Sequence, residues 1–280
     1  MVSTVDTLVY AIGGGHGHAR RGWLLQQCLL QSGRDAVLLI RPGSDRHLPA
    51  SQGVRLYARS LADSHLATLR RHAPRRIVVD TFPAGWCGEL DSALLGRFGR
   101  RVWIARYAQG LEKRGTAYDQ VLAPYPVGRC EWMGGLGGAV QAGYFVDAGH
   151  VAVTTDASCF TVLDPEGRCG ARVLAVFAKL ARRAGLLWRY QRRVISPLPA
   201  RKLLAVGAGY HTFYELLGQG ADLRFLPVRK RYDDQFRRAG LFGLDLSRLD
   251  QVLPWLAAPF RPVAEDTMPR WSEALALLEG

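Results

Sequence analysis

Side chains with the chemistry for ligand binding gather between Gly207 and Ala239. A Gly-Ala-Gly turn precedes a predicted helix at Tyr210–Leu217, which carries Glu215. A predicted strand and a basic loop then lead to the adjacent pair Asp234–Gln235. Free N–H groups at a helix start can hold a diphosphate, a carboxylate one turn further along can bind ribose hydroxyls, and a polar pair beyond the next strand can contact a sugar. In this order the residues can form one binding site for a sugar nucleotide.

A loop rich in glycine and histidine forms a second candidate site. The sequence IGGGHGHARR occupies residues 12–21, directly after a predicted strand. Because the pKa of histidine lies near neutral pH, His18 could act as a general base on an acceptor hydroxyl or on water, or could only hydrogen-bond the acceptor. His16 is a weaker candidate for the same work. Alternatively, both histidines cap the following helix and contact solvent.

The same loop does not match a dinucleotide-binding fingerprint. Its glycines permit positive φ and a close approach of the backbone, but their spacing is not that of G-x-G-x-x-G. The second predicted strand ends in LLIRPG rather than in an acidic residue. NAD binding is therefore not expected, and no other cofactor is predicted.

Strands and helices alternate along the first half of the chain. The predicted strands are Thr7–Ile12, Ala36–Ile40, Arg76–Asp80, Arg101–Ala105 and Gln120–Ala123, and the predicted helices are Arg21–Ser32, Ser60–His72 and Cys87–Phe98. The alternation predicts a parallel sheet with right-handed crossovers, in which ligands bind beyond the carboxyl ends of the strands. The histidine loop, Asp80 and the pair Arg106–Tyr107 follow strand ends and should share one rim. There Asp80 either orients an acceptor or His18, or caps the following turn.

A glycine-rich stretch from Gly134 to Gly149 interrupts the alternation. We interpret it as the passage between two domains, at residues 1–140 and 141–280. The second half repeats the pattern, with predicted strands at Val151–Thr154, Phe160–Leu163, Arg193–Ser196 and Leu223–Val228 and predicted helices at Arg172–Ala184 and Met268–Leu278. One large doubly wound domain is the alternative.

The net charge of +13 favours anionic partners, such as nucleotide diphosphates, an acidic acceptor or an anionic membrane face. Residues 180–194, LARRAGLLWRYQRRV, could lie on such a membrane surface or form a helix face packed on the sheet. The sequence contains no helix-turn-helix, zinc-finger or RNP-like pattern, so a nucleic acid partner is not expected.

Cysteine usage and hydropathy bear on the compartment. The five cysteines include no CxxC pair and no metal-ligand spacing, which predicts reduced thiols and no metal site. The N-terminus lacks the charged region of a secretory signal, and no apolar run approaches the ~20 residues that span a bilayer. We therefore expect a cytoplasmic protein, at most peripheral at the inner face of the membrane.

Both candidate sites resemble those of a known family. The C-terminal segment resembles the nucleotide-sugar motif of GT-B glycosyltransferases, above all the bacterial N-acetylglucosaminyltransferase that makes lipid II, and more distantly the plant-type UDP-glycosyltransferase signature. The glycine loop with His18 is similar to the first loop of the lipid II enzyme. The pattern G-H-x-x-R, Gly17–Arg21, is also similar to the loop of the nucleotide-sugar hydrolases of pseudaminic acid synthesis.

The resemblance implies an α/β fold of GT-B type, with two Rossmann-like parallel-sheet domains facing a cleft. It implies a UDP- or dTDP-sugar as substrate and no metal. His18 would be catalytic, and Glu215 would hold the ribose hydroxyls. The other donor-binding residues would be Gly207, Gly209, Tyr210, His211, Thr212, Asp234 and Gln235. The acceptor or phosphate side would comprise Gly14, Gly15, Arg21, Asp80 and Arg231.

The sequence departs from the family pattern in three places. Gly207 stands where plant-type enzymes have a histidine, and no proline follows Gly220–Asp222. The loop that opens the second domain, LDPEGRCG, carries Asp164 and Glu166, which would repel a diphosphate unless they point away.

These features predict a glycosyltransferase of hexosyl or N-acetylhexosaminyl type, acting without a metal on a small-molecule or lipid-linked acceptor. One alternative is a nucleotide-sugar hydrolase with water as the acceptor. Another is a non-catalytic GT-B protein that stabilises a partner transferase.

Overall fold

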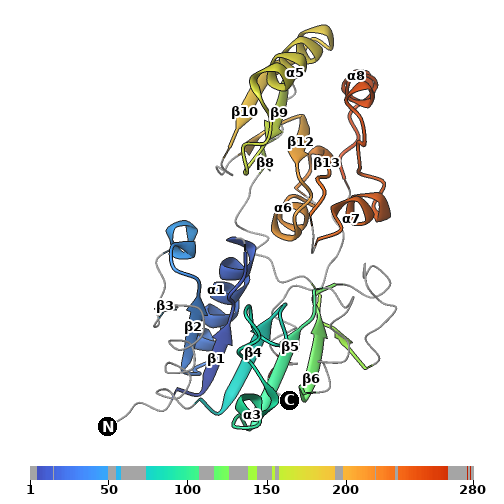
Figure 1. Cartoon of the computed structure of the whole chain (residues 1–280). Coiled ribbons are helices and arrows are strands. Elements are labelled where there is room, and N and C mark those ends of the chain that lie inside the picture. Colours follow the sequence, from blue (N-terminus) through green and yellow to red (C-terminus); the bar gives the residue numbers. More distant parts are fainter. Residues whose placement is uncertain are drawn as a thin grey trace. The chain divides into compact units, whose positions relative to one another are not determined.

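The structure is a computed structural model of the whole chain (Figure 1). It describes residues 5–14, 16–49, 55–57, 74–106, 117–125, 138–143, 153–154, 158–192, 198–217, 219–230, 233–263, 276 and 278. Several predicted features lie outside these residues, namely Gly15, the helix at Ser60–His72, Tyr107, the strand at Arg193–Ser196 and Arg231.

The chain divides into two compact units. Unit 1 comprises Met1–Val146 together with Met268–Gly280, and unit 2 comprises Asp147–Thr267. The C-terminal segment thus belongs to unit 1, whereas the predicted domains were 1–140 and 141–280. Arg76 Nη1 donates a hydrogen bond to the Leu278 carbonyl at 3.0 Å, and the Leu278 side chain is buried in the core of unit 1.

Unit 1 is built on a parallel sheet of seven strands in the order β3-β2-β1-β4-β5-β6-β7. Its central strands are runs of buried apolar residues, as expected for a parallel sheet covered on both faces. The strands are β1 (Thr7–Tyr10), β2 (Ala36–Ile40), β3 (Arg55–Tyr57), β4 (Arg76–Asp80), β5 (Arg100–Ile104), β6 (Gln120–Ala123) and β7 (Val140–Gln141). Strand β7 lies within the predicted interdomain passage, so part of that stretch belongs to the sheet of unit 1.

Helix α1 (His16–Gln31) packs on one face of this sheet, where Ala19, Leu25 and Leu29 join a core cluster with Val9 and Leu38. Its close approach depends on a glycine. A Cβ at Gly22 would lie 2.4 Å from the Cβ of Ala11, so no larger residue fits without displacing the helix. The helix begins five residues before the predicted start at Arg21, which places His18 inside it rather than in the loop.

The opposite face of the sheet is covered by the segment after β4. It ends in a short helix, α3 (Ser92–Leu95), where a helix over Cys87–Phe98 was predicted. The prediction was too long at the start because Asp91 caps the helix, accepting a hydrogen bond from the Leu94 amide at 2.7 Å. The 3-10 helix η1 (Ser44–His47) follows β2.

Unit 2 contains a parallel sheet of four strands in the order β10-β9-β12-β13 and a separate pair, β11-β8. The four-stranded sheet consists of β9 (Cys159–Leu163), β10 (Leu187–Gln191), β12 (Lys202–Val206) and β13 (Asp222–Leu226), and the pair of β8 (Val153–Thr154) and β11 (Leu198–Pro199). The helices are α5 (Ala171–Arg183), α6 (Tyr210–Leu216), α7 (Gln235–Leu241), η2 (Leu249–Gln251) and α8 (Val252–Ala257).

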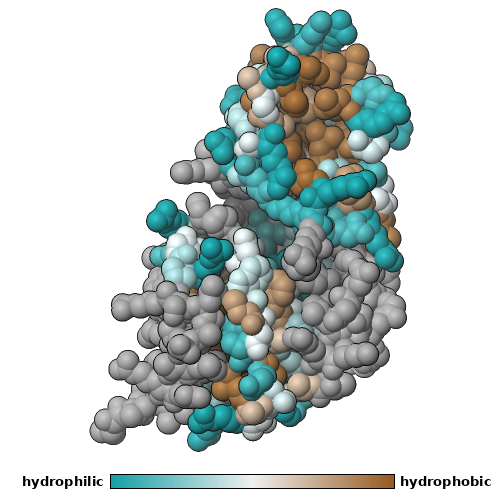
Figure 2. Space-filling model, viewed as in Figure 1, coloured by the Kyte–Doolittle hydropathy of each residue, from teal (hydrophilic) through white to brown (hydrophobic). Residues whose placement is uncertain are grey.

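The core of unit 2 lies between the sheet and helices α5 and α8. Phe160, Phe177 and Trp255 form its centre, and its less buried members reach the surface, where Figure 2 shows apolar residues over this end of the unit. The interpretation of residues 180–194 as one helix face was wrong. Helix α5 ends at Arg183, Gly185 turns the chain with φ +69°, and β10 follows.

A buried ion pair joins the sheet of unit 2 to the end of α8. Lys202 Nζ lies 2.6 Å from Asp222 Oδ2 and donates to the carbonyls of Trp255 and Ala258, each at 3.0 Å. The indole of Trp255 donates to the other Asp222 oxygen at 2.8 Å. The charge of Lys202 is therefore satisfied by oxygens on two segments, β13 and the end of α8. Within the described residues, no helix is long and apolar enough to cross a membrane.

Candidate functional site

The topology of unit 1 defines where a ligand should bind. In the sheet, β1 and β4 are neighbours. From β1 the chain passes through α1 to β2, toward one edge of the sheet, whereas from β4 it passes to β5, toward the other edge. The two connections leave a crevice beyond the carboxyl ends of β1 and β4, which is the usual ligand site of such sheets. Helix α1 brings His18 and Arg21 to this point, and β4 brings Asp80.

These three side chains form one buried cluster. His18 Nδ1 lies 2.6 Å from Asp80 Oδ2. Arg21 Nε donates to Asp80 Oδ1 and Arg21 Nη2 to Asp80 Oδ2, each at 2.8 Å. His18 and Arg21 are three residues apart on a helix and so share one face. The sequence left three roles open for Asp80, namely orienting an acceptor, orienting His18 or capping the following turn. In the structure its carboxylate is bound to His18 and Arg21.

The cluster fixes the protonation of His18. Burial alone would raise the pKa of Asp80, but the Arg21 guanidinium and His18 outweigh it and hold that pKa well below its ordinary value. An ionised carboxylate only accepts hydrogen bonds, so we assign the proton of His18 to Nδ1. Burial lowers the pKa of His18, against the attraction of Asp80. The imidazole is therefore neutral near pH 7 and carries a basic lone pair on Nε2.

The backbone beside Asp80 has an unusual conformation. Thr81 has φ +71°, the only positive φ at a residue other than glycine among those the structure describes. The Phe82 amide donates to the Asp80 carbonyl at 2.8 Å, and Trp103 Nε1 donates to the Thr81 carbonyl at 3.1 Å. Positive φ is costly for a β-branched residue. The turn therefore holds a strained backbone directly after the carboxylate that binds His18.

Aromatic side chains form a wall beside His18. The ring centroids of His18 and Phe82 are 5.4 Å apart, and those of Phe82 and Trp86 are 4.9 Å apart. A Cβ on Gly13 would lie 2.3 Å from Cδ2 of His18, and one on Gly14 would lie 3.1 Å from the indole of Trp86. The two glycines are thus required for the fit between the loop and these rings. The side chain of His16 is outside the described parts of the structure.

The sequence did not indicate the hydrogen bonds that hold the segment of Trp86 in place. Tyr10 donates to Glu89, and its hydroxyl accepts from the Trp86 amide at 2.9 Å. Glu89 also accepts from the Cys87 amide at 2.7 Å. Burial, followed by the hydrogen bond to Glu89, raises the pKa of Tyr10 far above its ordinary value, so the phenol stays protonated. No sequence motif indicates the contact between Tyr10 and Glu89, because the two residues are 79 positions apart.

Unit 2 has a crevice of the same topological kind. The chain leaves β9 through α5 to β10 on one side, and leaves β12 through α6 to β13 on the other. The segments after β9 and β12, Asp164–Gly170 and Gly207–Gly209, therefore begin at neighbouring carboxyl ends. These are the segments that the sequence placed at the donor phosphates.

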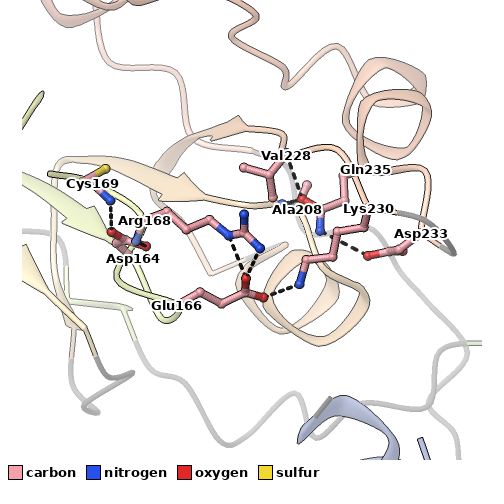
Figure 3. A network of polar contacts seen from close by, with 9 residues as sticks. All are labelled: Asp164, Glu166, Arg168, Cys169, Ala208, Val228, Lys230, Asp233 and Gln235. Carbon is pink, nitrogen blue, oxygen red and sulfur yellow. Dashed lines mark hydrogen bonds and ion pairs between the residues drawn. The ribbon is translucent and has the colours of Figure 1, made fainter. Parts of the chain in front are cut away.

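The Gly207 turn is held by a buried glutamine. Gly207 has φ +86°, a conformation that favours glycine. Gln235 Oε1 accepts from the Ala208 amide at 2.7 Å and from the Val228 amide at 3.1 Å, and Gln235 Nε2 donates to Asp233 at 3.2 Å (Figure 3). Gln235 was predicted to contact a donor sugar. Its carbonyl oxygen joins the turn to the segment that follows β13, and the contact with a sugar stays a prediction.

Asp234 and Arg238 complete this arrangement. Asp234 caps α7 by accepting a hydrogen bond from the Arg237 amide at 3.0 Å. Arg238, which the sequence did not single out, donates to the Ala208 carbonyl at 2.5 Å and to Asp233 at 2.7 Å. Its guanidinium lies 6.0 Å from the ring of Tyr210 and from that of Tyr214. Both the amide and the carbonyl of Ala208, in the Gly207 turn, are therefore bound by side chains of α7.

Glu215 is buried on α6, with 6% of its surface exposed. His211, one turn earlier, places Nδ1 3.4 Å from Glu215 Oε1. Tyr210 is buried, and Thr212 is half-buried. The structure thus brings the predicted residues Gly207, Gly209, Tyr210, His211, Thr212 and Glu215 onto one turn and one helix.

Both acidic residues of the loop after β9 have hydrogen-bond partners within unit 2. Asp164 is fully buried and accepts from the amides of Arg168 at 2.9 Å and Cys169 at 2.8 Å. Glu166 binds Arg168 and Lys230 (Figure 3). The repulsion expected from the sequence is thus reduced at both positions. Within the described parts of the chain, no group of three or more His, Cys, Asp or Glu residues could hold a metal ion.

Comparison with solved structures agrees with the architecture of the two units. The spinosyn rhamnosyltransferase SpnG, complexed with thymidine diphosphate, is 15% identical, and the match covers 99% of this chain and 100% of that one with a TM-score of 0.60. The calicheamicin glycosyltransferase CalG4 is 13% identical, over 90% of this chain and 88% of that one, with a TM-score of 0.55.

LpCGTa, in complex with UDP, is 11% identical over 98% of this chain and 94% of that one, with a TM-score of 0.52. No protein-family model matches the chain, and neither does any curated protein. At these identities the likeness concerns the fold, and it confirms the predicted α/β class. The chain has the GT-B fold of these glycosyltransferases.

Proposed function

We propose that the protein transfers a sugar from a nucleotide diphosphate donor to an acceptor hydroxyl. The observation that carries this proposal is the 2.6 Å contact between His18 Nδ1 and Asp80, at the crevice of unit 1. Asp80 keeps the imidazole in one tautomer, so that Nε2 can take a proton. A general base positioned in this way typically contributes 10²–10⁴-fold to a rate, on the order of what activating a hydroxyl requires.

The chemistry assigns one role to each unit. On unit 1, Nε2 of His18 removes the proton of the acceptor hydroxyl while that oxygen forms a bond to the anomeric carbon of the donor. The bond from this carbon to the donor phosphate breaks, and the nucleoside diphosphate leaves with the electron pair. The imidazolium formed at His18 is stabilised by the charge of Asp80.

On unit 2, the Gly207–Thr212 turn would hold the phosphates and Glu215 the ribose hydroxyls. We infer a UDP- or dTDP-sugar as the donor, since two of the similar structures are complexes with thymidine diphosphate and UDP. No metal is required in this scheme, because backbone N–H groups and basic side chains can stabilise the leaving diphosphate. The acceptor class, small-molecule or lipid-linked, stays a prediction, as do the cytoplasmic location and the peripheral membrane contact.

The test is the release of nucleoside diphosphate from a panel of UDP- and dTDP-sugars, with and without acceptor alcohols. The parent chain should release it, also in the presence of EDTA. His18→Gln should release it about 10²-fold or more slowly and still bind the nucleotide. Full activity of His18→Gln would contradict the assignment of the base.

Hydrolysis of the donor is the second candidate, because the proposed base, His18, could equally accept a proton from water. His18 and Arg21, the histidine and the arginine of the G-H-x-x-R pattern, both bind Asp80. Steady release of free sugar without any acceptor would favour this candidate. A glycosylated acceptor detected by mass spectrometry would favour transfer.

A further inference from the structure

We propose that Arg168 and Lys230 form the subsite for the diphosphate of the donor, and that the Glu166 carboxylate competes with the donor for these two cations. The subsite belongs to the nucleotide-sugar site of the proposed function, on which the identity of its ligand depends. Lys230 lies in the basic loop of the donor-binding segment that the sequence indicated, whereas Arg168 was not singled out there. Both follow from the contacts within unit 2.

The position of the three residues in the sheet is the first support. Glu166 and Arg168 follow β9, and Lys230 follows β13, while β12 lies between these two strands. The ion pair from Glu166 to Lys230 therefore crosses the carboxyl end of β12, where the Gly207 turn begins (Figure 3). An anion that approaches this turn meets both cations.

The geometry of the contacts is the second support. Glu166 Oε2 accepts from Arg168 Nε at 2.7 Å and lies 2.5 Å from Nη2, and Oε1 is bound by Lys230 Nζ. A guanidinium fork on one oxygen and an ammonium on the next is also how proteins bind phosphate oxygens. The side chains of Glu166, Arg168 and Lys230 are 47%, 42% and 34% exposed, so an ion from solvent can reach them.

The loop around Glu166 is held in place from inside. The buried Asp164 binds the amides of Arg168 and Cys169 and thereby shapes the turn that presents Glu166. Gly167 has φ +63°, and a Cβ there would lie 2.3 Å from Nη2 of Arg192, which places a further guanidinium beside the loop. Because Asp164 fixes the backbone of the loop, only the Glu166 side chain must rotate away for a phosphate to bind Arg168 and Lys230.

Glu166 is charged at neutral pH. Partial burial would raise its pKa, but the hydrogen bonds from Lys230 and Arg168 outweigh this effect and hold the pKa below its ordinary value. The competition is thus between two anions. Exposed ion pairs are weak, so the carboxylate can yield to a diphosphate of higher charge.

The experiment is calorimetric titration of the full chain with inorganic pyrophosphate, UDP and dTDP. The variants are Glu166→Gln and Lys230→Gln. Arg189→Gln, which removes an exposed charge from β10, is the matched control for Lys230→Gln. We expect Glu166→Gln to raise the affinity for all three probes about two- to fivefold. Lys230→Gln should lower it by about tenfold, and the control should resemble the parent.

Each outcome decides one of the two proposals. An unchanged or weaker affinity in Glu166→Gln, or an unchanged affinity in Lys230→Gln, would overturn the subsite. If UDP or dTDP binds equally to all four proteins, the proposed function stands and the subsite falls. If pyrophosphate shows the expected pattern but neither nucleotide binds, the subsite stands as a diphosphate site and the proposed function falls.

Discussion

At the scale of single residues, the proposed sugar transfer depends on a neutral His18 whose Nδ1 proton is hydrogen-bonded to Asp80. Every charged neighbour of His18 acts on its pKa. Burial lowers the pKa, Asp80 raises it, and the cations Arg21 and Arg106 lower it, with a net shift below the ordinary value. Since the base must be unprotonated, activity should fall on acidification only below the ordinary histidine pKa of about 6.5.

The variant Asp80→Asn tests this balance. Removal of the carboxylate abolishes the one interaction that raises the pKa of His18, so the acidic limb of the kcat/KM profile should move to lower pH. The rate at neutral pH should fall about 10²-fold or more, because an amide no longer fixes the tautomer. A limb that moves to higher pH would contradict the assignment. An unfolding curve must accompany the profile, because the variant leaves Arg21 buried without its anion.

The fit between Gly13 and His18 makes a second prediction. In Gly13→Ala the new methyl would overlap the imidazole at 2.3 Å, so the ring must move away from Asp80. We expect activity to fall by about tenfold or more, since small displacements of a catalytic group are costly. Gly240→Ala is the control, because a Cβ at Gly240 has nothing within 4 Å. Equal activity of the two variants would show that the fit is unimportant.

At the scale of elements, the buried ion pair between β12 and β13 supports the sheet that carries the Gly207 turn. Lys202→Met should destabilise the protein by about 3–5 kcal/mol, because Asp222 would remain buried without its cation. The measurement is urea unfolding followed by circular dichroism. Lys179→Met, on the exposed face of α5, removes the same charge at the surface and should have little effect. A similar small effect for both would contradict the role given to Lys202.

The central strands of unit 1 and the helices α5 and α6 were predicted close to their observed bounds, whereas β10 and β12 of unit 2 were not predicted as strands. Buried parallel strands such as β4 are short apolar runs that the sequence displays directly. The first turn of α1 contains His18, whose partner Asp80 is 62 positions away, and the sequence does not display such a contact. The stretch 180–194 has the composition of an amphipathic helix, but Gly185 ends the helix and starts a strand.

The candidate site was predicted in part for the same reason. The sequence indicated His18, Arg21 and Asp80 as neighbours, because all three lie near strand ends of one sheet. It did not indicate that Gln235 would bind backbone amides or that Arg238 would be buried beneath the turn. Both roles arise from the packing of α7 against the Gly207 turn. A motif that names residue types does not distinguish a ligand contact from such support.

At the scale of the whole molecule, each unit contains a parallel sheet in which two neighbouring strands are followed by connections toward opposite edges. Such a position in a parallel sheet is a usual ligand site. In the proposed function, unit 1 provides the base His18, and unit 2 provides the Gly207 turn, the buried Glu215 and the cations Arg168 and Lys230. The net charge of +13 favours an anionic ligand over the molecule as a whole.

Calorimetric titration of the full chain with UDP, dTDP and their sugars, repeated with Glu215→Gln, tests whether unit 2 binds a nucleotide sugar. We expect that one nucleotide binds, and that the variant binds it about tenfold or more weakly, because a charged hydrogen bond to the ribose is lost. Unchanged binding in the variant would contradict the role of Glu215. The absence of binding by every nucleotide would contradict both transfer and hydrolysis, and would favour a protein that acts through a partner.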